Sequence, residues 1–227
     1  MRPVMDLHSH TFYSACGKDP HEAVIEAAVA GGVELFGISD HNYGVGPHLA
    51  AYVADIRRMQ EKYGGQLRLL LGLELSGRPG QVLTEPEKLA GFDYVLQEHI
   101  DEDWSEVQLD VLEKRRACPC RFGIAHTDLI GWAKKRGEDP AAFLRRFADA
   151  DIFWEMNVSY DSIHNYREHE YVKRFVADPA EQDIVRRSGI RLSVGFDGHR
   201  VEDYAPGRVL QMNRFLEENG FPVVEFE

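Results

Sequence analysis

Seven short apolar segments alternate along the chain with stretches in which apolar residues recur at helical spacing, and this alternation is the strongest constraint on the fold. The apolar segments are residues 4–7, 33–38, 67–73, 92–96, 122–125, 152–156 and 190–196. Strands that alternate with helices form parallel sheets joined by helical crossovers. No low-complexity linker interrupts the 227 residues, so we expect residues 1–227 to form one α/β domain. Two arrangements remain open, a doubly wound sheet and a closed barrel.

Helix starts can be located from capping residues and prolines. Asp19 is expected to cap a helix that has Pro20 at its first position and an exposed His21 in its first turn. A helix is predicted to follow Pro47, and apolar spacing predicts another over residues 104–115. Further helices are predicted from Asp139, around residues 171–176 and 184–185, and over residues 209–216. No G-x-G-x-x-G motif follows the first strand, which disfavours a dinucleotide-binding fold.

Composition excludes several classes of function. The chain has 26 Lys and Arg against 38 Asp and Glu, a formal net charge of −12, whereas proteins that bind many phosphates of a nucleic acid are usually basic. No apolar run approaches the ~18 to 20 residues of a membrane-spanning helix, and the first residues lack the apolar segment of a secretory signal. Three cysteines, an odd number, cannot all pair within the chain. We therefore expect a cytoplasmic protein that binds neither membranes nor extended nucleic acid.

Histidines and acidic residues follow the ends of the predicted strands. The histidines are His8, His10, His41, His99, His126 and His199, and the acidic residues are Glu74, Glu155 and Asp197. Every strand contributes at least one of these residues near its carboxyl end. In parallel α/β folds that end of the sheet is where active sites are built.

The spacing within three of these segments indicates a metal site. The residues in each of three pairs, His8 and His10, Glu155 and Asn157, and Asp197 and His199, are two positions apart, so the members of each pair point to the same face of an extended chain. Unpaired polar groups cost roughly 2 to 7 kcal/mol each to bury, and a divalent ion would satisfy several of them together. Imidazole mixed with carboxylate suits Zn, Mn or Fe better than Mg or Ca. We therefore predict a site for two or three divalent transition metals.

The ordered set of motifs resembles the PHP (polymerase and histidinol phosphatase) family. The motifs are Asp6-Leu-His-Ser-His-Thr11, Ser39-Asp-His41, Gly72-Leu-Glu74, His99, Ala125-His-Thr-Asp128, Glu155-Met-Asn157 and Phe196-Asp-Gly-His199. They run over nearly the whole chain with one motif to each strand. The resemblance implies a distorted, TIM-like (β/α)7 barrel that holds two or three metals at the carboxyl ends of its strands. It also implies hydrolysis of phosphoesters.

The resemblance further implies how the ligands are shared among the ions. His8, His10, Glu74 and Asp197 would surround one metal. A bridging Glu74, with His99 and His126, would hold a second metal, and His41 and His199 would belong to the remaining one. We expect Asp40, Glu155 and Asn157 to orient these ligands rather than bind a metal.

One position departs from the family pattern. The family usually has an Asp or His ligand five or six residues after the second histidine of the first motif, where this chain has Ala15 and Cys16. Cys16 could bind as a thiolate, or His21 could reach the site from the following helix. Otherwise the metal near His41 would be weak, absent or completed by water.

The predicted activity is metal-dependent hydrolysis of a small phosphomonoester, such as histidinol phosphate, a sugar phosphate or a nucleotide. Two metals can lower the pKa of a bound water to about 7, and the resulting hydroxide would attack the phosphorus. His164, in a possible specificity loop over residues 160–170, and Asp128 are candidates for the general acid. Arg200, Lys18 and Arg78 are candidates for binding a phosphate oxygen.

Two alternative functions remain open from the sequence. An amidohydrolase-like enzyme that cleaves C–N bonds also carries an H-x-H motif after its first strand, but it uses a metal-bridging lysine after the fourth strand. Residues 96–99 here read Leu-Gln-Glu-His, without a lysine. The second alternative is a metal-binding regulatory domain without catalytic activity, which the departure at Ala15 and Cys16 suggests.

Overall fold

All seven predicted strands are present and form one parallel sheet in the order of the chain. The computed structural model describes residues 2–159 and 170–226. The strands are β1 (Met5–Asp6), β2 (Leu35–Ile38), β3 (Arg68–Leu75), β4 (Tyr94–Gln97), β5 (Arg121–Ile124), β6 (Ile152–Asn157) and β7 (Leu192–Gly195). Each strand pairs in parallel with the next one along the chain.

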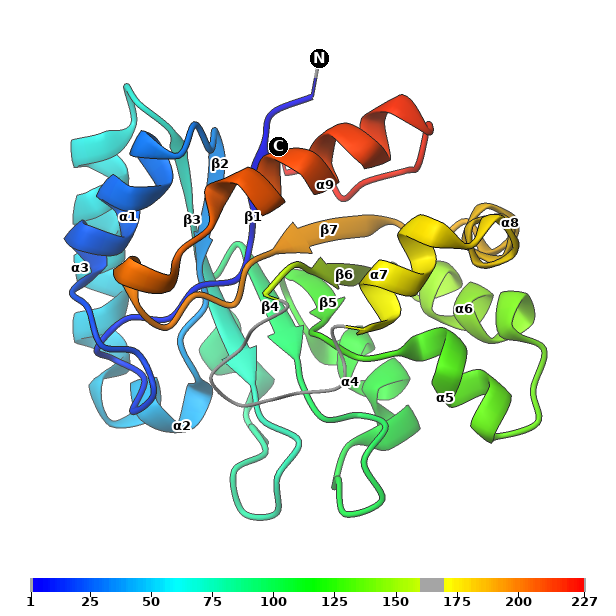
Figure 1. The fold of residues 1–227 in the computed structure, drawn as a ribbon. Helices are drawn as coiled ribbons and strands as arrows, with labels where there is room; N and C mark the ends of the chain where they lie inside the picture. Colours follow the sequence, from blue (N-terminus) through cyan, green and yellow to red (C-terminus); the bar gives the residue numbers. More distant parts are fainter. Residues whose placement is uncertain (1, 160–169, 227) are drawn as a thin grey trace.

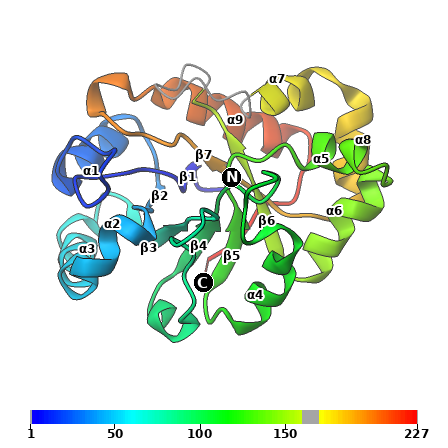
Figure 2. The same ribbon diagram turned by 90° about the horizontal axis from the view of Figure 1, so that it is seen from below.

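The first and last strands meet, so the sheet curves into a barrel (Figures 1 and 2). The backbone N–H of Leu7 donates to the carbonyl oxygen of Val194 at 2.9 Å, and Ser9 forms an isolated parallel bridge with Gly198. Because β1 has only two residues, the closure is short and the barrel is distorted. The prediction of a distorted (β/α)7 barrel is therefore confirmed.

Helices surround the strands (Figure 2). The α-helices are α1 (His21–Ala30), α2 (Asn42–Val45), α3 (Leu49–Tyr63), α4 (Val111–Ala117), α5 (Leu129–Lys135), α6 (Pro140–Asp149), α7 (Glu170–Ala177), α8 (Pro179–Ser188) and α9 (Pro206–Glu218). Short 3-10 segments are η1 (Gly46–His48), η2 (Pro86–Leu89), η3 (Gln108–Asp110) and η5 (Val201–Asp203). No described helix is long and apolar enough to cross a membrane. The cytoplasmic location stays a prediction.

Two helix predictions were wrong in detail because tertiary contacts compete with the local signals. Asp19 does not cap α1, since its carboxylate accepts a hydrogen bond from the backbone N–H of Val201 at 2.8 Å. Residues 104–107 are not helical, because the backbone N–H of Glu106 bonds to the carbonyl oxygen of Gly77 at 3.0 Å. By contrast, Asp139 caps α6 as predicted, accepting from the backbone N–H of Ala142.

Buried side chains, Tyr94 among them, fill the barrel interior up to the carboxyl ends of the strands. Tyr94 is fully buried, and its hydroxyl donates to the carbonyl oxygen of Leu7 at 2.5 Å. A Cβ atom at Gly37 or Gly72 would collide with the Tyr94 ring, so these glycines make room for it. The space that remains lies at the carboxyl ends of the strands.

Candidate metal centre

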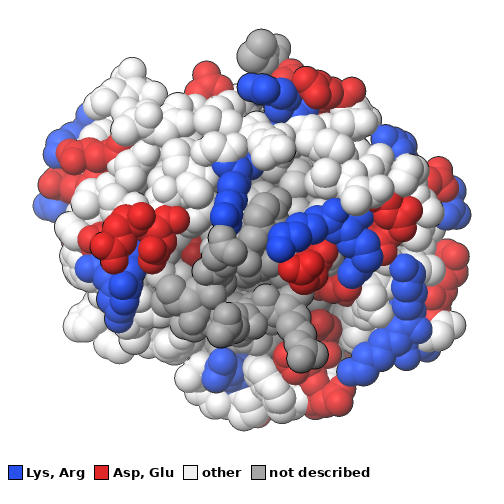
Figure 3. Space-filling view, viewed as in Figure 1, with Lys and Arg blue, Asp and Glu red and all other residues white. Residues whose placement is uncertain are grey.

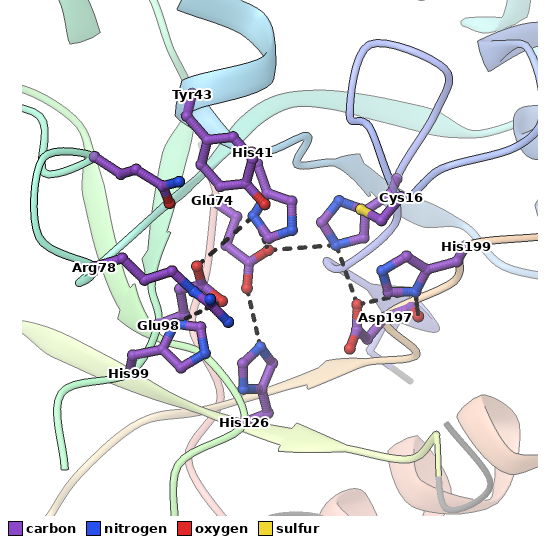
Figure 4. A pocket seen from close by; sticks show the side chains of 12 residues that line it. Cys16, His41, Tyr43, Glu74, Arg78, Glu98, His99, His126, Asp197 and His199 are labelled. Atoms are coloured by element: carbon purple, nitrogen blue, oxygen red, sulfur yellow. Dashed lines mark hydrogen bonds and ion pairs between the residues drawn. The ribbon is translucent and has the colours of Figure 1, made fainter. Parts of the chain in front are cut away.

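The predicted histidines and acidic residues converge on one pocket with a volume of about 250 Å³ (Figure 4). The residues that line it are His10, Cys16, His41, Tyr43, Glu74, Arg78, Gln81, Glu98, His99, His126, Asp197 and His199. His8 lies fully buried directly behind this surface. The carboxyl end of the barrel therefore carries the cluster that the motifs predicted.

Two of these residues have an unusual backbone conformation. His99 and Asp197 have φ angles of 60° and 57°, in the left-handed region that non-glycine residues rarely occupy. The backbone N–H of Asp197 donates to the carbonyl oxygen of His8 at 2.7 Å, which ties this turn to the end of β1. Such conformations persist where the surrounding structure enforces them, and they concentrate at functional sites.

Glu155 fixes the orientation of His8. Its Oε1 lies 2.8 Å from His8 Nδ1, and both side chains are fully buried. Its Oε2 accepts from the backbone N–H of His126 at 2.7 Å and from Asn157 Nδ2 at 3.3 Å. Because a carboxylate only accepts, His8 Nδ1 carries the proton and the lone pair of the neutral ring is on Nε2.

Ser14 and Asp40 fix the orientation of His10 in the same way. The Ser14 hydroxyl donates to Asp40 Oδ1 at 2.6 Å and accepts from the backbone N–H of His41 at 2.8 Å. The remaining contact of this hydroxyl is with His10 Nδ1 at 3.2 Å, so Nδ1 is the donor. The lone pair of neutral His10 is therefore also on Nε2. Asp40 contacts the cluster through Ser14, and its role in orienting the ligands stays a prediction.

The two Nε2 lone pairs face each other. His8 Nε2 and His10 Nε2 are 3.1 Å apart, and Asp197 Oδ1 lies 3.1 Å from the latter. Two lone pairs and a carboxylate oxygen at these distances repel one another unless a proton or a metal cation lies among them. The orientation of both rings thus favours a cation at this point.

Glu74 lies at the centre of the cluster. Its Oε1 is 3.0 Å from His126 Nε2 and 3.3 Å from His8 Nε2. Its Oε2 is 2.9 Å from His41 Nδ1 and 3.3 Å from His10 Nε2. One carboxylate therefore faces four imidazoles, as a carboxylate that bridges two ions would.

The donor set fits transition metals. The Nδ1 atoms of His41 and His99 are buried and make no hydrogen bond to any described residue, although Glu74 and Glu98 oxygens lie nearby. Among the residues that the structure describes, donor atoms lie within 4.8 Å of one another in four groups. The groups are His8–Glu74–His126, His8–His10–Asp197, His10–His41–Glu74 and His10–Cys16–His199. Imidazole nitrogen, carboxylate oxygen and thiolate sulfur are the ligands of Zn and related ions.

The electrostatics of the cluster show how strongly it attracts cations. Burial alone would raise the pKa of the Glu74 carboxyl, but the charges of His8 and His41 hold that pKa well below its usual range. Burial would lower the pKa of His41, but Glu74 outweighs it and raises this pKa to about 11. Burial and the charge of His199 lower the pKa of His10 to about 3, so His10 is neutral near pH 7. A divalent cation would replace the protons that the other rings hold.

The structure separates the candidate phosphate-binding and acid residues. Arg78 lines the pocket, and its guanidinium lies 5.5 Å from the Trp104 ring. Lys18 and Arg200 are exposed and do not line it, and Arg200 pairs with Glu202 at 3.2 Å.

The structure does not bring Asp128 to the pocket either. It caps α5 and forms a bidentate ion pair with Arg174 at 2.8 and 2.9 Å. The carboxylate of Asp128 accepts from the backbone N–H of Gly131 and pairs with Arg174. These contacts keep the Asp128 side chain away from the cluster. His164 and most of the predicted specificity loop lie outside the described residues.

Several residues of the site were not predicted from the sequence. Tyr43 stacks on His41 with ring centroids 4.8 Å apart, and Glu98 lies 3.0 Å from His99 Nδ1. Both are within two positions of a predicted ligand, and that proximity is the signal that could have identified them. His21 is buried rather than exposed, because its ring packs against Phe12. It does not line the pocket.

Comparisons with known proteins identify similar chains and a family. A curated protein of Acetivibrio thermocellus named "Probable phosphatase" is 24% identical over 233 residues, which cover 98% of this chain and 89% of that protein. The crystal structure of histidinol phosphate phosphatase from Lactococcus lactis subsp. lactis, solved with zinc, L-histidinol and phosphate, has a TM-score of 0.66. It is 17% identical, and the match covers 98% of this chain and 96% of that chain, so it supports the fold. The family model described as "PHP domain" matches residues 6–159, which carry the cluster residues from β1 to β6. The chain therefore belongs to the PHP domain family.

Proposed function

We propose that this protein is a metal-dependent phosphatase that hydrolyses a small phosphomonoester, with residues 1–227 acting as one domain. The observation that carries the proposal is the Glu74 carboxylate facing four imidazoles, with the lone pairs of His8 and His10 turned toward each other. Family membership adds support. The names of the two relatives, a "Probable phosphatase" and a histidinol phosphate phosphatase, point to the same reaction class.

The cluster would hold two or three divalent transition ions, drawn from Zn, Mn and Fe. His8, His10 and Asp197 would bind one ion, and Glu74 would bridge it to a second ion held with His126 and His99. When bound, such ions supply an activated water and neutralise the charge of a phosphate. Glu155, through His8, and Asp40, through Ser14 and His10, keep the ligating nitrogens turned toward the ions.

Arg78 would bind the phosphate. It is the only Lys or Arg among the described residues that line the pocket. A guanidinium pairs well with a phosphate oxygen, and the indole of Trp104 beneath it restricts its motion. Its position would offset the acidic net charge of −12 where an anionic substrate enters.

The pocket dimensions favour a small substrate. A volume of about 250 Å³ accommodates a phosphate and a small leaving group. Histidinol phosphate, a sugar phosphate and a nucleotide all fit this description. On the described part of the face shown in Figure 3, basic and acidic side chains are interspersed, so this face offers no continuous basic surface for a nucleic acid.

Phosphate release from a substrate panel tests this function. Purified protein is stripped with a chelator, reloaded with Zn or Mn, and assayed with p-nitrophenyl phosphate, histidinol phosphate, sugar phosphates and nucleotides. We expect release that requires the metal and that is abolished in Glu74→Gln. If the reloaded protein releases phosphate from none of these substrates, the result would contradict the proposal. In that case metal binding alone would favour a regulatory domain.

A further inference from the structure

One of the four groups of donor atoms among the described residues contains a cysteine and no carboxylate. Cys16 lines the pocket between His41 and His199 (Figure 4). Its Sγ and one nitrogen each of His10 and His199 all lie within 4.8 Å of one another. His41 lines the pocket beside this group, and its donor atom lies within 4.8 Å of His10 as well. Cys16, His199 and His41 therefore lie around His10 at this side of the pocket.

The loop that carries Cys16 is held at both ends. At its start, Thr11 donates to Asp40 from its backbone N–H and from its hydroxyl, each at 2.7 Å. At its end, the backbone N–H of Lys18 donates to the carbonyl oxygen of His199 at 2.9 Å. A Cβ atom at Gly17 would collide with the Thr11 backbone, so the glycine permits this tight return. The loop thus places the thiol at the cluster rather than in solvent.

Each of the neighbouring histidines has a ring nitrogen of a type that can bind an ion. His199 Nδ1 lies 2.9 Å from the carbonyl oxygen of Asp197, which only accepts, so the lone pair of its neutral ring is on Nε2. His41 is buried, and its Nδ1 makes no hydrogen bond to any described residue. The Cys16 thiol therefore lies between two imidazoles, those of His199 and His41.

We propose that Cys16 binds, as a thiolate and together with His199 and His41, a third divalent ion that is thiophilic. This inference rests on the proposed function, since it adds an ion to the same site. Soft thiolate ligands select Zn and related ions, whereas Mn and Mg prefer carboxylate and water. The chain would thus combine a carboxylate-bridged pair of ions with a thiolate-containing site that rejects Mn and Mg.

Cobalt substitution gives a direct readout of the sulfur ligand. A thiolate bound to Co(II) produces a near-ultraviolet charge-transfer band that nitrogen and oxygen ligands do not produce. The titration is done in a Cys118→Ser/Cys120→Ser background, so that Cys16 is the only thiol. At full cobalt loading, we expect the band to have the intensity of one thiolate-bound cobalt ion per chain. Cys16→Ser in this background should lose the band and one equivalent of bound metal, and Cys16→Asp should lose the band and gain affinity for Mn.

The visible cobalt bands and phosphate release are measured as well, so that loss of the thiolate ligand can be distinguished from unfolding and from loss of activity. The visible cobalt bands of the remaining sites should persist in Cys16→Ser, which would show that the variant is folded. A cobalt-loaded protein without the charge-transfer band, or with the same band after Cys16→Ser, would overturn the inference. If that protein still releases phosphate, the proposed function stands without the thiolate ligand. A band without any phosphate release would instead contradict the phosphatase and retain the thiolate site.

Discussion

Glu155 illustrates how one buried residue controls the cluster without lining the pocket. It contacts His8 Nδ1 at 2.8 Å and the backbone N–H of His126 at 2.7 Å, and so positions two of the proposed metal ligands at once. Glu155→Gln removes the charge that fixes His8, and we expect metal affinity to fall about 10- to 100-fold. Isothermal titration of the stripped protein with Zn measures this change. Glu113→Gln, which alters an exposed carboxylate, serves as the control and should bind as the wild type does.

Arg78 is the residue on which substrate binding should depend most among the described cations. Hydrogen bonds to charged groups contribute about 1.5–3 kcal/mol, so Arg78→Ala should lower kcat/KM about 10- to 100-fold. Metal content should not change, because Arg78 is not in any of the donor groups. Lys18→Ala and Arg200→Ala are matched controls from outside the pocket. Equal losses in all three variants would contradict a specific role for Arg78.

At the scale of elements, the meeting of β1 and β7 couples the fold to the site. Gly195, the last residue of β7, lies so close to Glu155 and His8 that a Cβ atom would collide with both. We expect Gly195→Ala to lower the free energy of unfolding by about 1–3 kcal/mol and to weaken metal binding. Gly207→Ala in α9 is the control, because its Cβ meets nothing within 4 Å and alanine is favoured in a helix. Denaturant unfolding compares the two variants.

The elements themselves were predictable where the signals were local. Each of the seven strands was located because buried parallel strands are nearly continuous apolar runs. The stretch 104–107 misled the prediction, because apolar spacing cannot reveal that Glu106 bonds to Gly77 on a distant loop. The cap at Asp19 failed for the same reason, since Val201, far along the chain, takes its carboxylate.

At the scale of the molecule, the ions should contribute to stability because the folded chain alone assembles their ligands. Ligand at about a hundredfold excess over its Kd stabilises a fold by about 2.7 kcal/mol. For a chain of this size, chelation should therefore lower Tm by about 5–10 °C. Differential scanning calorimetry with and without chelator measures the shift, and added Zn should reverse it. An unchanged Tm would show that the buried Glu74 and its imidazoles need no cation.

The histidines of the site were predictable from the sequence, but the contacts that connect its residues were not. Placement after strand ends identified every histidine that now lines the pocket. The sequence could not show that Ser14 links Asp40 to His10, because that contact depends on side-chain orientations in a folded loop. Nor could it show that Asp128 is held by Arg174, which lies 46 positions away in the chain.

The central claim is that donors from around the barrel share a cluster of ions at its mouth. Anomalous scattering at the zinc edge, from crystals of the zinc-loaded protein, tests it most directly. The account predicts two or three peaks at about 2.0–2.3 Å from nitrogen, oxygen and sulfur donors, with Glu74 between two of them. Zinc bound elsewhere on the surface, with His8 and His10 hydrogen-bonded to each other and no peak beside Glu74, would contradict the account.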